Sequence, residues 1–215
     1  VQPTDRFSQM FDLTFDLSVH DLFVCWGGGA CLCVVPEKVT LAPADFIRQK
    51  NLTMWFSVPS VAMFLARYRM LPVGAFPSLR YSLFCGEALP ASLADQWQKA
   101  APNSIVENLY GPTEATIAIT NYRWDAKKSP AECLNGLTPI GWPFSGQRCA
   151  VIDAQRKPLP AGEAGELCLS GSQVTQGYLN NPTKTREQYI VIPELGEATW
   201  YRTGDLVRQD ENGCL

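Results

Sequence analysis

Hydrophobic and polar positions along the first 125 residues predict short strands separated by helices. Apolar runs bounded by Gly, Pro or polar clusters indicate buried strands, and the segments between them repeat apolar residues at helical spacing. The expected strands are Ala30 to Val35, Thr53 to Val58, Arg80 to Phe84 and Ser104 to Val106. The expected helices are Val19 to Trp26, Pro43 to Lys50, Ser60 to Tyr68 and Pro90 to Ala100. This alternation predicts an α/β fold with a largely parallel sheet flanked by helices.

The pattern changes after Thr120, where a polar connector from Asp125 to Pro130 precedes short strands broken by Gly and Pro. The expected strands are Arg148 to Ile152, Gly165 to Ser170, Thr199 to Arg202 and Leu206 to Gln209. We therefore expect an α/β subdomain over residues 1–125 and a smaller β-rich lobe, a distorted barrel, over residues 126–215. The turn Asp210 to Gly213 would begin a hairpin whose second strand is cut off.

Three loops follow strands of the predicted sheet, at the edge where such sheets bind ligands. They are Phe56 to Pro59, Cys85 to Ala88 and Asn108 to Glu114. In the second loop, Gly86 would let the backbone approach a flat base closely, although a tight turn alone would also explain it. We expect a nucleotide and substrate pocket at this edge of the sheet.

The loop from Asn108 to Thr116 offers the chemistry that a nucleotide needs. Gly111 and Pro112 break regular structure, so the neighbouring side chains lie on a stiff loop. Tyr110 could stack on a base, Thr113 could bind a phosphate oxygen, and Glu114 could hold Mg²⁺, because hard cations prefer oxygen ligands. Read without its context, the same loop could be only a polar turn.

Asp16 lies just before the first helical pattern and invites two interpretations. It could cap the helix, or its carboxylate among apolar neighbours could await a cation such as a ligand ammonium group. His20 follows four residues later on the same face, where a single histidine is usually structural.

Composition excludes several classes of function. A net charge of -3 without blocks of like charge predicts no binding to nucleic acid or to an anionic membrane. No apolar run is long enough to span a bilayer, and the first residues do not form a signal pattern, so we expect a cytoplasmic protein. The eight cysteines contain no Cys-x-x-Cys pair and the chain has one histidine, which argues against a zinc site. The three glycines from Gly27 to Gly29 could suggest a phosphate-binding loop, but no Lys-Ser/Thr pair follows them. We therefore expect them to end the preceding helix.

Four stretches, in order and spacing, resemble the core motifs of the adenylate-forming superfamily, which includes amino-acid adenylation domains, acyl-CoA synthetases and luciferases. They are Phe15 to Ser18, Asn108 to Thr116, Gly165 to Leu179 and Tyr201 to Leu206. The resemblance implies a fragment of the large N-terminal domain of such an enzyme. The family's phosphate loop would lie before Val1 and its catalytic lysine after Leu215, so the isolated chain is expected to be inactive.

The resemblance implies ATP and Mg²⁺ as cofactors and gives the loop residues roles. Tyr110 would contact adenine, Thr113 and Glu114 would be catalytic through phosphate and metal, and Asp205 would bind both ribose hydroxyls. A carboxylate that accepts two hydroxyl donors forms strong, charge-assisted hydrogen bonds. The expected nucleotide-binding residues are Gly86, Glu87, Ala88, Asn108, Tyr110, Gly111, Thr113 and Asp205.

On the substrate side, the resemblance implies that Asp16 binds the α-ammonium group of an amino acid. The other expected lining residues are Leu17, His20, Phe56, Leu83, Cys85, Leu109, Ile117 and Ala118. This nearly apolar lining suits a small or apolar side chain. The stretch from Phe84 to Pro90 is similar to D-alanine:carrier-protein ligases, in which a cysteine at the position of Cys85 crowds the substrate α-carbon. The chain departs from that subgroup at Leu109 and His20.

The implied reaction is ATP-dependent formation of an aminoacyl-adenylate, followed by transfer to the phosphopantetheine thiol of a carrier protein or domain. Two alternatives remain open. An acyl- or aryl-CoA synthetase would leave the Asp16 carboxylate unpaired, and a catalytically degenerate binding module would not need the intact Tyr110, Thr113, Glu114 and Asp205.

Overall fold

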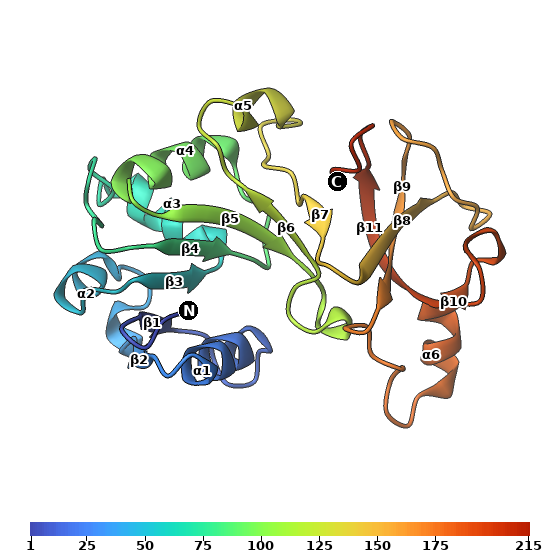
Figure 1. Cartoon of the computed structure of the whole chain (residues 1–215), viewed down its shortest axis with the longest axis horizontal. Coiled ribbons are helices and arrows are strands. Elements are labelled where there is room, and N and C mark those ends of the chain that lie inside the picture. The colour runs from blue at the N-terminus through green and yellow to red at the C-terminus, as the bar shows by residue number, and fades with distance from the viewer. The chain divides into compact units, whose positions relative to one another are not determined.

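A computed structural model describes all residues, 1–215, and the chain divides into two compact units. The first unit contains Val1–Leu109 and Tyr122–Pro139, and the second contains Tyr110–Asn121 and Ile140–Leu215. Each unit is built from its own layers and core (Figure 1).

The first unit is a parallel sheet with flanking helices, as the sequence predicts. Its strands lie in the order β2-β1-β3-β4-β5, and every neighbouring pair is parallel. They are β1 (Arg6–Gln9), β2 (Cys31–Val34), β3 (Met54–Ser57), β4 (Tyr81–Phe84) and β5 (Ile105–Tyr110). The helices are α1 (Leu17–Gly27), α2 (Ala44–Gln49), α3 (Pro59–Arg67), α4 (Ala91–Ala100) and α5 (Ser129–Glu132), with a 3-10 turn at Glu37–Val39. The predicted α/β class is therefore confirmed.

Helices cover both faces of this sheet, which explains why β3 is apolar and buried along its whole length. Trp55 stacks on Trp97 of α4, with ring centroids 6.1 Å apart, whereas Phe56 meets His20 of α1 at 4.7 Å. Because successive residues of a strand point to opposite faces, α4 and α1 lie on opposite sides of the sheet. Phe84 and Phe76 complete the aromatic core around Trp97.

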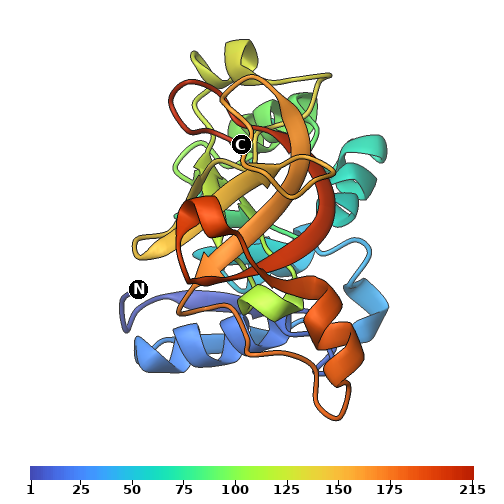
Figure 2. The same ribbon diagram turned by 90° about the vertical axis from the view of Figure 1, so that its right-hand side faces the viewer.

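The second unit contains a four-stranded antiparallel sheet with the strand order β10-β11-β9-β8, whereas the short antiparallel pair β6-β7 ends the seven-stranded sheet that begins with β2. The four strands are β8 (Gln147–Ile152), β9 (Ala164–Gly171), β10 (Tyr189–Val191) and β11 (Thr199–Arg208), and the pair consists of β6 (Thr120–Arg123) and β7 (Trp142–Pro143). One helix, α6 (Pro182–Gln188), and 3-10 turns at Thr113–Ala115 and Pro193–Leu195 complete it. Figure 2 shows how strongly β11 curves, and the apolar core of the unit includes Leu167, Leu169 and Tyr201.

Strand β11 corrects one detail of the sequence interpretation, which expected separate strands from Thr199 to Arg202 and from Leu206 to Gln209. The structure joins them into one strand, which pairs with β9 on both sides of a register shift between Arg202 and Leu206. Gly204 lies within this bulge and has a φ of 79°, a conformation that favours glycine. A bulge of this kind bends the strand and redirects the side chain next to it, here that of Asp205.

Candidate functional site

The first unit brings the carboxyl ends of three strands to one edge of its sheet. Phe56 of β3 pairs in register with Leu83 of β4, and Phe84 of β4 pairs with Asn108 of β5. The residues that follow these positions therefore leave the sheet at the same edge. Among the predicted substrate residues, Leu83, Cys85 and Leu109 are buried there.

Asp16 occupies the N-cap position of α1, at the start of the helix. Its backbone carbonyl accepts the amide hydrogen of Val19, but its carboxylate makes no capping hydrogen bond and has no ion-pair partner in the chain. The side chain is only half-buried. Asp16 therefore does not cap the helix through its carboxylate, and that carboxylate is available to a cation.

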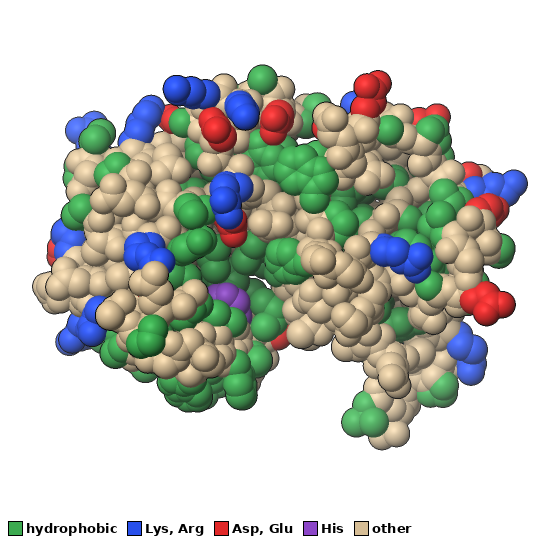
Figure 3. All heavy atoms as spheres, in the orientation of Figure 1, with side chains coloured by type: hydrophobic (Ala, Val, Ile, Leu, Met, Phe, Trp, Pro, Cys, Tyr) green, Lys and Arg blue, Asp and Glu red, His purple; other side chains and the backbone are tan.

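His20 and Leu17 extend the same side of α1 toward the sheet edge. The His20 ring packs edge-on against Phe56, which in turn contacts Phe11 with ring centroids 5.0 Å apart. Figure 3 shows the imidazole, in purple, reaching the surface, and 17% of the side chain is exposed. A Cβ atom added to Gly86 would lie 3.9 Å from Leu17 Cδ1, so this loop closely approaches α1. The structure thus gathers several predicted substrate residues around one helix end and one sheet edge.

The predicted nucleotide-binding residues of the first unit differ in whether their polar groups already have hydrogen-bond partners within the chain. The Glu87 carboxylate accepts hydrogen bonds from the backbone N–H and the hydroxyl of Ser60, at 2.8 and 3.0 Å, and so caps α3. Gly86 and Ala88 are exposed. Asn108 is buried and donates to the Pro139 carbonyl at 2.9 Å, whereas its Oδ1 is buried without a partner. Asn108 therefore offers an unused acceptor.

In the second unit, Tyr110 and Asp205 meet directly. The Tyr110 hydroxyl donates to Asp205 Oδ2 at 2.5 Å, although the two residues are 95 positions apart. Burial, together with this hydrogen bond, raises the pKa of Tyr110, so the phenol remains a donor. Asp205 is itself held in the bulge of β11, because its amide donates to the Thr203 hydroxyl at 3.0 Å.

Glu166 anchors this bulge from the neighbouring strand. Its Oε1 accepts the amide hydrogen of Gly204 at 3.1 Å, and its Oε2 accepts two hydrogen bonds from Arg202, at 3.0 and 2.6 Å. A carboxylate bound both by a guanidinium and by the backbone fixes the strand geometry. Glu166 lay within a motif noted in the sequence, but its role depends on the pairing of β9 with β11, which the sequence did not supply.

Glu114 is surrounded by tyrosines. Its carboxylate accepts a hydrogen bond from the Tyr178 hydroxyl, and its backbone carbonyl accepts one from the Thr175 amide at 2.8 Å. Burial alone would raise the pKa of Glu114, but hydrogen bonds from Tyr178 and Tyr201 outweigh it, and the pKa is lowered. Lys184, whose ammonium group lies 5.0 Å from the Tyr178 ring centroid, acts in the same direction. The carboxylate is therefore kept ionised, as a metal ligand must be.

The segment from Gly111 to Ala118 is compact and strained. A Cβ atom at Gly111 would lie 2.6 Å from the Ala118 backbone, so only glycine fits. Thr116 and Ile117 both have positive φ values, 58° and 74°, which β-branched residues rarely adopt. Gln173 stabilises this conformation through two hydrogen bonds. Its backbone carbonyl accepts one from the Thr116 hydroxyl at 2.7 Å, and its side-chain amide donates one to the Ala118 carbonyl at 2.8 Å. Thr113 is exposed, and its hydroxyl has no partner in the chain.

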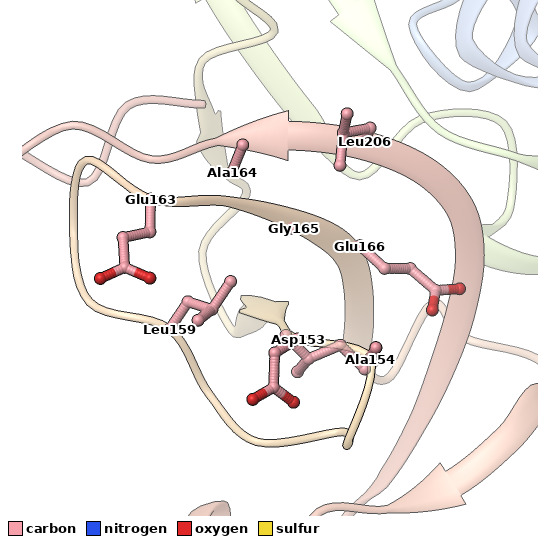
Figure 4. Close-up of a pocket in the computed structure, with 9 residues that line it drawn as sticks. Asp153, Ala154, Leu159, Glu163, Ala164, Gly165, Glu166 and Leu206 are labelled. Atoms are coloured by element: carbon pink, nitrogen blue, oxygen red, sulfur yellow. The ribbon is translucent and has the colours of Figure 1, made fainter.

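A separate cavity of about 410 Å³ lies in the second unit between β8, β9 and β11. Figure 4 shows the carboxylates of Asp153, Glu163 and Glu166 around it, and Leu159 and Leu206 supply apolar surface. None of the predicted site residues lines it. We therefore do not assign the nucleotide or the substrate to this cavity.

Comparison with known proteins agrees with the geometry of both units. The family model described as AMP-binding enzyme matches residues 1–179. Isonitrile lipopeptide synthase of Mycobacterium tuberculosis is 37% identical over 209 residues, which cover 97% of this chain and 8% of the relative. Enterobactin synthase component F of Escherichia coli is 34% identical over 216 residues, covering 98% and 17%.

Among solved structures, the Vibrio cholerae adenylation domain AlmE in complex with glycyl-adenosine-5'-phosphate has a TM-score of 0.91 and 43% identity. The match covers 100% of this chain and 40% of that chain. The chain therefore belongs to the AMP-binding enzyme family, whose members form adenylates. More particularly, its fold is that of part of an amino-acid adenylation domain, and its relatives are adenylation domains of nonribosomal peptide synthetases.

The chain spans less than a tenth of the length of the first curated relatives and less than half of the adenylation domain named above. None of its helices combines the length and the apolarity needed to cross a membrane.

Proposed function

We propose that these residues are part of an enzyme that activates an amino acid with ATP and transfers the aminoacyl group to the phosphopantetheine thiol of a carrier protein or domain. The observation that carries the proposal is the Asp16 carboxylate, which is half-buried at the start of α1 and has no partner in the chain. An α-ammonium group satisfies such a carboxylate, because opposite charges at close range favour each other in a partly desolvated site.

The nucleotide is assigned to residues whose chemistry fits it. The unpartnered Oδ1 of Asn108 is an acceptor for an exocyclic amino group, and Tyr110 offers an aromatic face. Asp205 accepts ribose hydroxyls, and the exposed Thr113 hydroxyl binds a phosphate oxygen. The ionised Glu114 would hold Mg²⁺, whose charge would offset that of the phosphates. In the full-length parent, these residues would contribute to catalysis by positioning and charge stabilisation.

We infer a small or apolar substrate side chain, with D-alanine as a specific candidate. Leu17, Leu83 and Leu109 are apolar and buried, so a charged side chain would find no partner among them. Cys85 is buried at the end of β4, as expected for the residue that crowds the α-carbon. The glycyl-adenylate bound by the Vibrio cholerae relative is consistent with a small side chain.

The test is amino-acid-dependent pyrophosphate exchange by the full-length parent protein, with a panel that compares alanine enantiomers, small and large L-amino acids and propionate. Propionate lacks the ammonium group and would leave the half-buried Asp16 carboxylate unpaired and further desolvated, so propionate should be rejected by roughly 100-fold or more in kcat/KM. The Cys85→Ala variant should discriminate less between D- and L-alanine.

Each outcome of this panel is decisive for one part of the proposal. Propionate activated as well as alanine would refute the amino-acid assignment and favour an acyl- or aryl-CoA synthetase. Exclusive use of a large L-amino acid would refute only the small-substrate assignment. No exchange with any substrate would favour a binding module without catalysis.

A further inference from the structure

Asp21, one residue beyond His20 on α1, is a buried acid that none of the roles described above uses. Its side chain is completely buried, and its Oδ2 has no hydrogen-bond partner. Its Oδ1 lies 3.3 Å from His20 Nδ1, and a backbone hydrogen bond from Met10 also reaches the carboxylate. Burying a carboxylate with so few partners is unfavourable, so its presence calls for a function.

The geometry around His20 points to that function. Nδ1 faces Asp21, one side of the ring packs against Phe56, and Nε2 has no hydrogen-bond partner in the chain. In a neutral imidazole, one nitrogen carries the hydrogen and the other accepts, and the partner of one nitrogen decides which is which. Because the Asp21 carboxylate can accept a hydrogen bond from Nδ1, Nδ1 carries the hydrogen and Nε2 keeps the free lone pair.

We propose that Asp21 is a positioning residue of the amino-acid pocket: it accepts the Nδ1 hydrogen of His20, and thereby fixes both the ring orientation and Nε2 as the acceptor. This inference rests on the proposed function, because His20 matters to the reaction only as a lining residue of the substrate pocket. Asp21 does not contact the substrate. It acts through His20, as carboxylates do when they orient metal-binding or catalytic histidines.

Asp21 also explains how a histidine can hold one position at the edge of an apolar pocket. Packing against Phe56 restrains the plane of the ring, but a flat ring can still rotate by 180° about the Cβ–Cγ bond, which places ring carbons where Nδ1 and Nε2 had been. The contact with Asp21 removes this freedom. Two restraints from different elements, β3 and α1 itself, then define a single arrangement.

The first test uses the 215-residue chain without a histidine tag, because His20 is its only histidine and the ¹⁵N spectrum contains one imidazole. At neutral pH, the wild type should show a protonated Nδ1 and an unprotonated Nε2. Asp21→Ala, which removes the acceptor, should move the hydrogen to Nε2, and Asp21→Asn, which keeps a carbonyl acceptor, should preserve the wild-type spectrum. A wild-type ring protonated at Nε2, or identical spectra for wild type and Asp21→Ala, would overturn the proposal.

The second test measures pyrophosphate exchange by the full-length parent. Asp21→Ala should raise KM for the preferred amino acid by about tenfold, within the range of coupling between contacting residues, and should leave KM for ATP within about twofold. Asp21→Asn should restore KM to within about twofold. In a His20→Phe background, Asp21→Ala should have little further effect, whereas a purely structural role would give the same loss in both backgrounds.

These outcomes separate this inference from the proposed function. Normal exchange with an unchanged KM in Asp21→Ala would refute the positioning role alone. Absence of exchange in the wild-type parent would refute the proposed function, and with it the pocket role of Asp21.

Discussion

Replacement of Asp21 by asparagine should change how the stability of the chain depends on pH. Burial raises the pKa of Asp21 to about 6 from an ordinary value of 3.8, against the opposing effects of His20 and the Met10 backbone. Because the folded state binds the proton more tightly, the stabilisation from Asp21 is fully present below the unfolded pKa and is lost as pH rises through about 6.

The expected magnitude follows from the two pKa values. A shift of this size corresponds to about 3 kcal/mol when fully expressed, since one unit is about 1.4 kcal/mol. Between about pH 7.5 and about pH 5, the wild type should gain roughly 1.4 kcal/mol of unfolding free energy relative to Asp21→Asn, which does not titrate. Asp5, a buried acid whose pKa is lowered and whose contribution is lost as pH falls, is present in both proteins and cancels.

The assay is urea unfolding of both proteins at the two pH values, with Asp45→Asn as the control. Asp45 is exposed and lies on another helix, so its replacement should leave the pH dependence unchanged. A difference between wild type and Asp21→Asn that stays constant with pH, or that reverses its sign, would refute the buried-acid reasoning.

Three further predictions concern the second unit and the chain as a whole. In the full-length parent, Asp205→Ala should raise KM for ATP by about tenfold, and Glu114→Gln should slow adenylate formation by about 100-fold; unchanged kinetics in both would contradict the nucleotide assignment. The isolated 215-residue chain, even when folded, should show no pyrophosphate exchange with any amino acid, and exchange by a preparation free of contaminating enzyme would show that the catalytic groups are misplaced. Gln173→Ala should lower the unfolding free energy by about 1 to 2 kcal/mol in urea, because the side-chain amide loses its hydrogen bonds to the Ala118 and Thr116 carbonyls of a strained segment, whereas the exposed Gln176→Ala should be neutral.

The sequence predicted the α/β class and most central strands because those strands are short apolar runs between clear breaking residues. It did not predict β1 (Arg6–Gln9), in which three of four side chains are polar, α6, which is polar, or β10, which has only three residues. It also split β11, because Gly204 looks like a strand end when pairing with β9 is unknown. The local pattern of apolar residues thus identified the strands whose sequences are apolar because both faces are buried. It failed for strands whose existence and length depend on pairing with a distant strand.

The candidate site shows a similar division. Tyr110, Glu114 and Asp205 stand out as residue types, but the hydrogen bonds from Tyr110 to Asp205 and from Tyr178 to Glu114 join residues 95 and 64 positions apart. Asp21 could not be found from its neighbours, because an acid on an amphipathic helix ordinarily faces solvent. Its burial became visible only when α1 was packed against the sheet.

The left-handed backbone at Thr116 and Ile117 has a consequence for any redesign of this loop, in which Ile117 is one of the residues proposed to line the substrate pocket. A side chain on such a backbone leaves the chain in a direction that φ and ψ fix, before any rotamer is chosen. Replacing Ile117 by another residue therefore changes the size of the side chain but hardly changes the direction of its Cα–Cβ bond. Glycine at either position would free the loop to turn elsewhere, so a library that varies 117 should keep Thr116 and Gln173 constant.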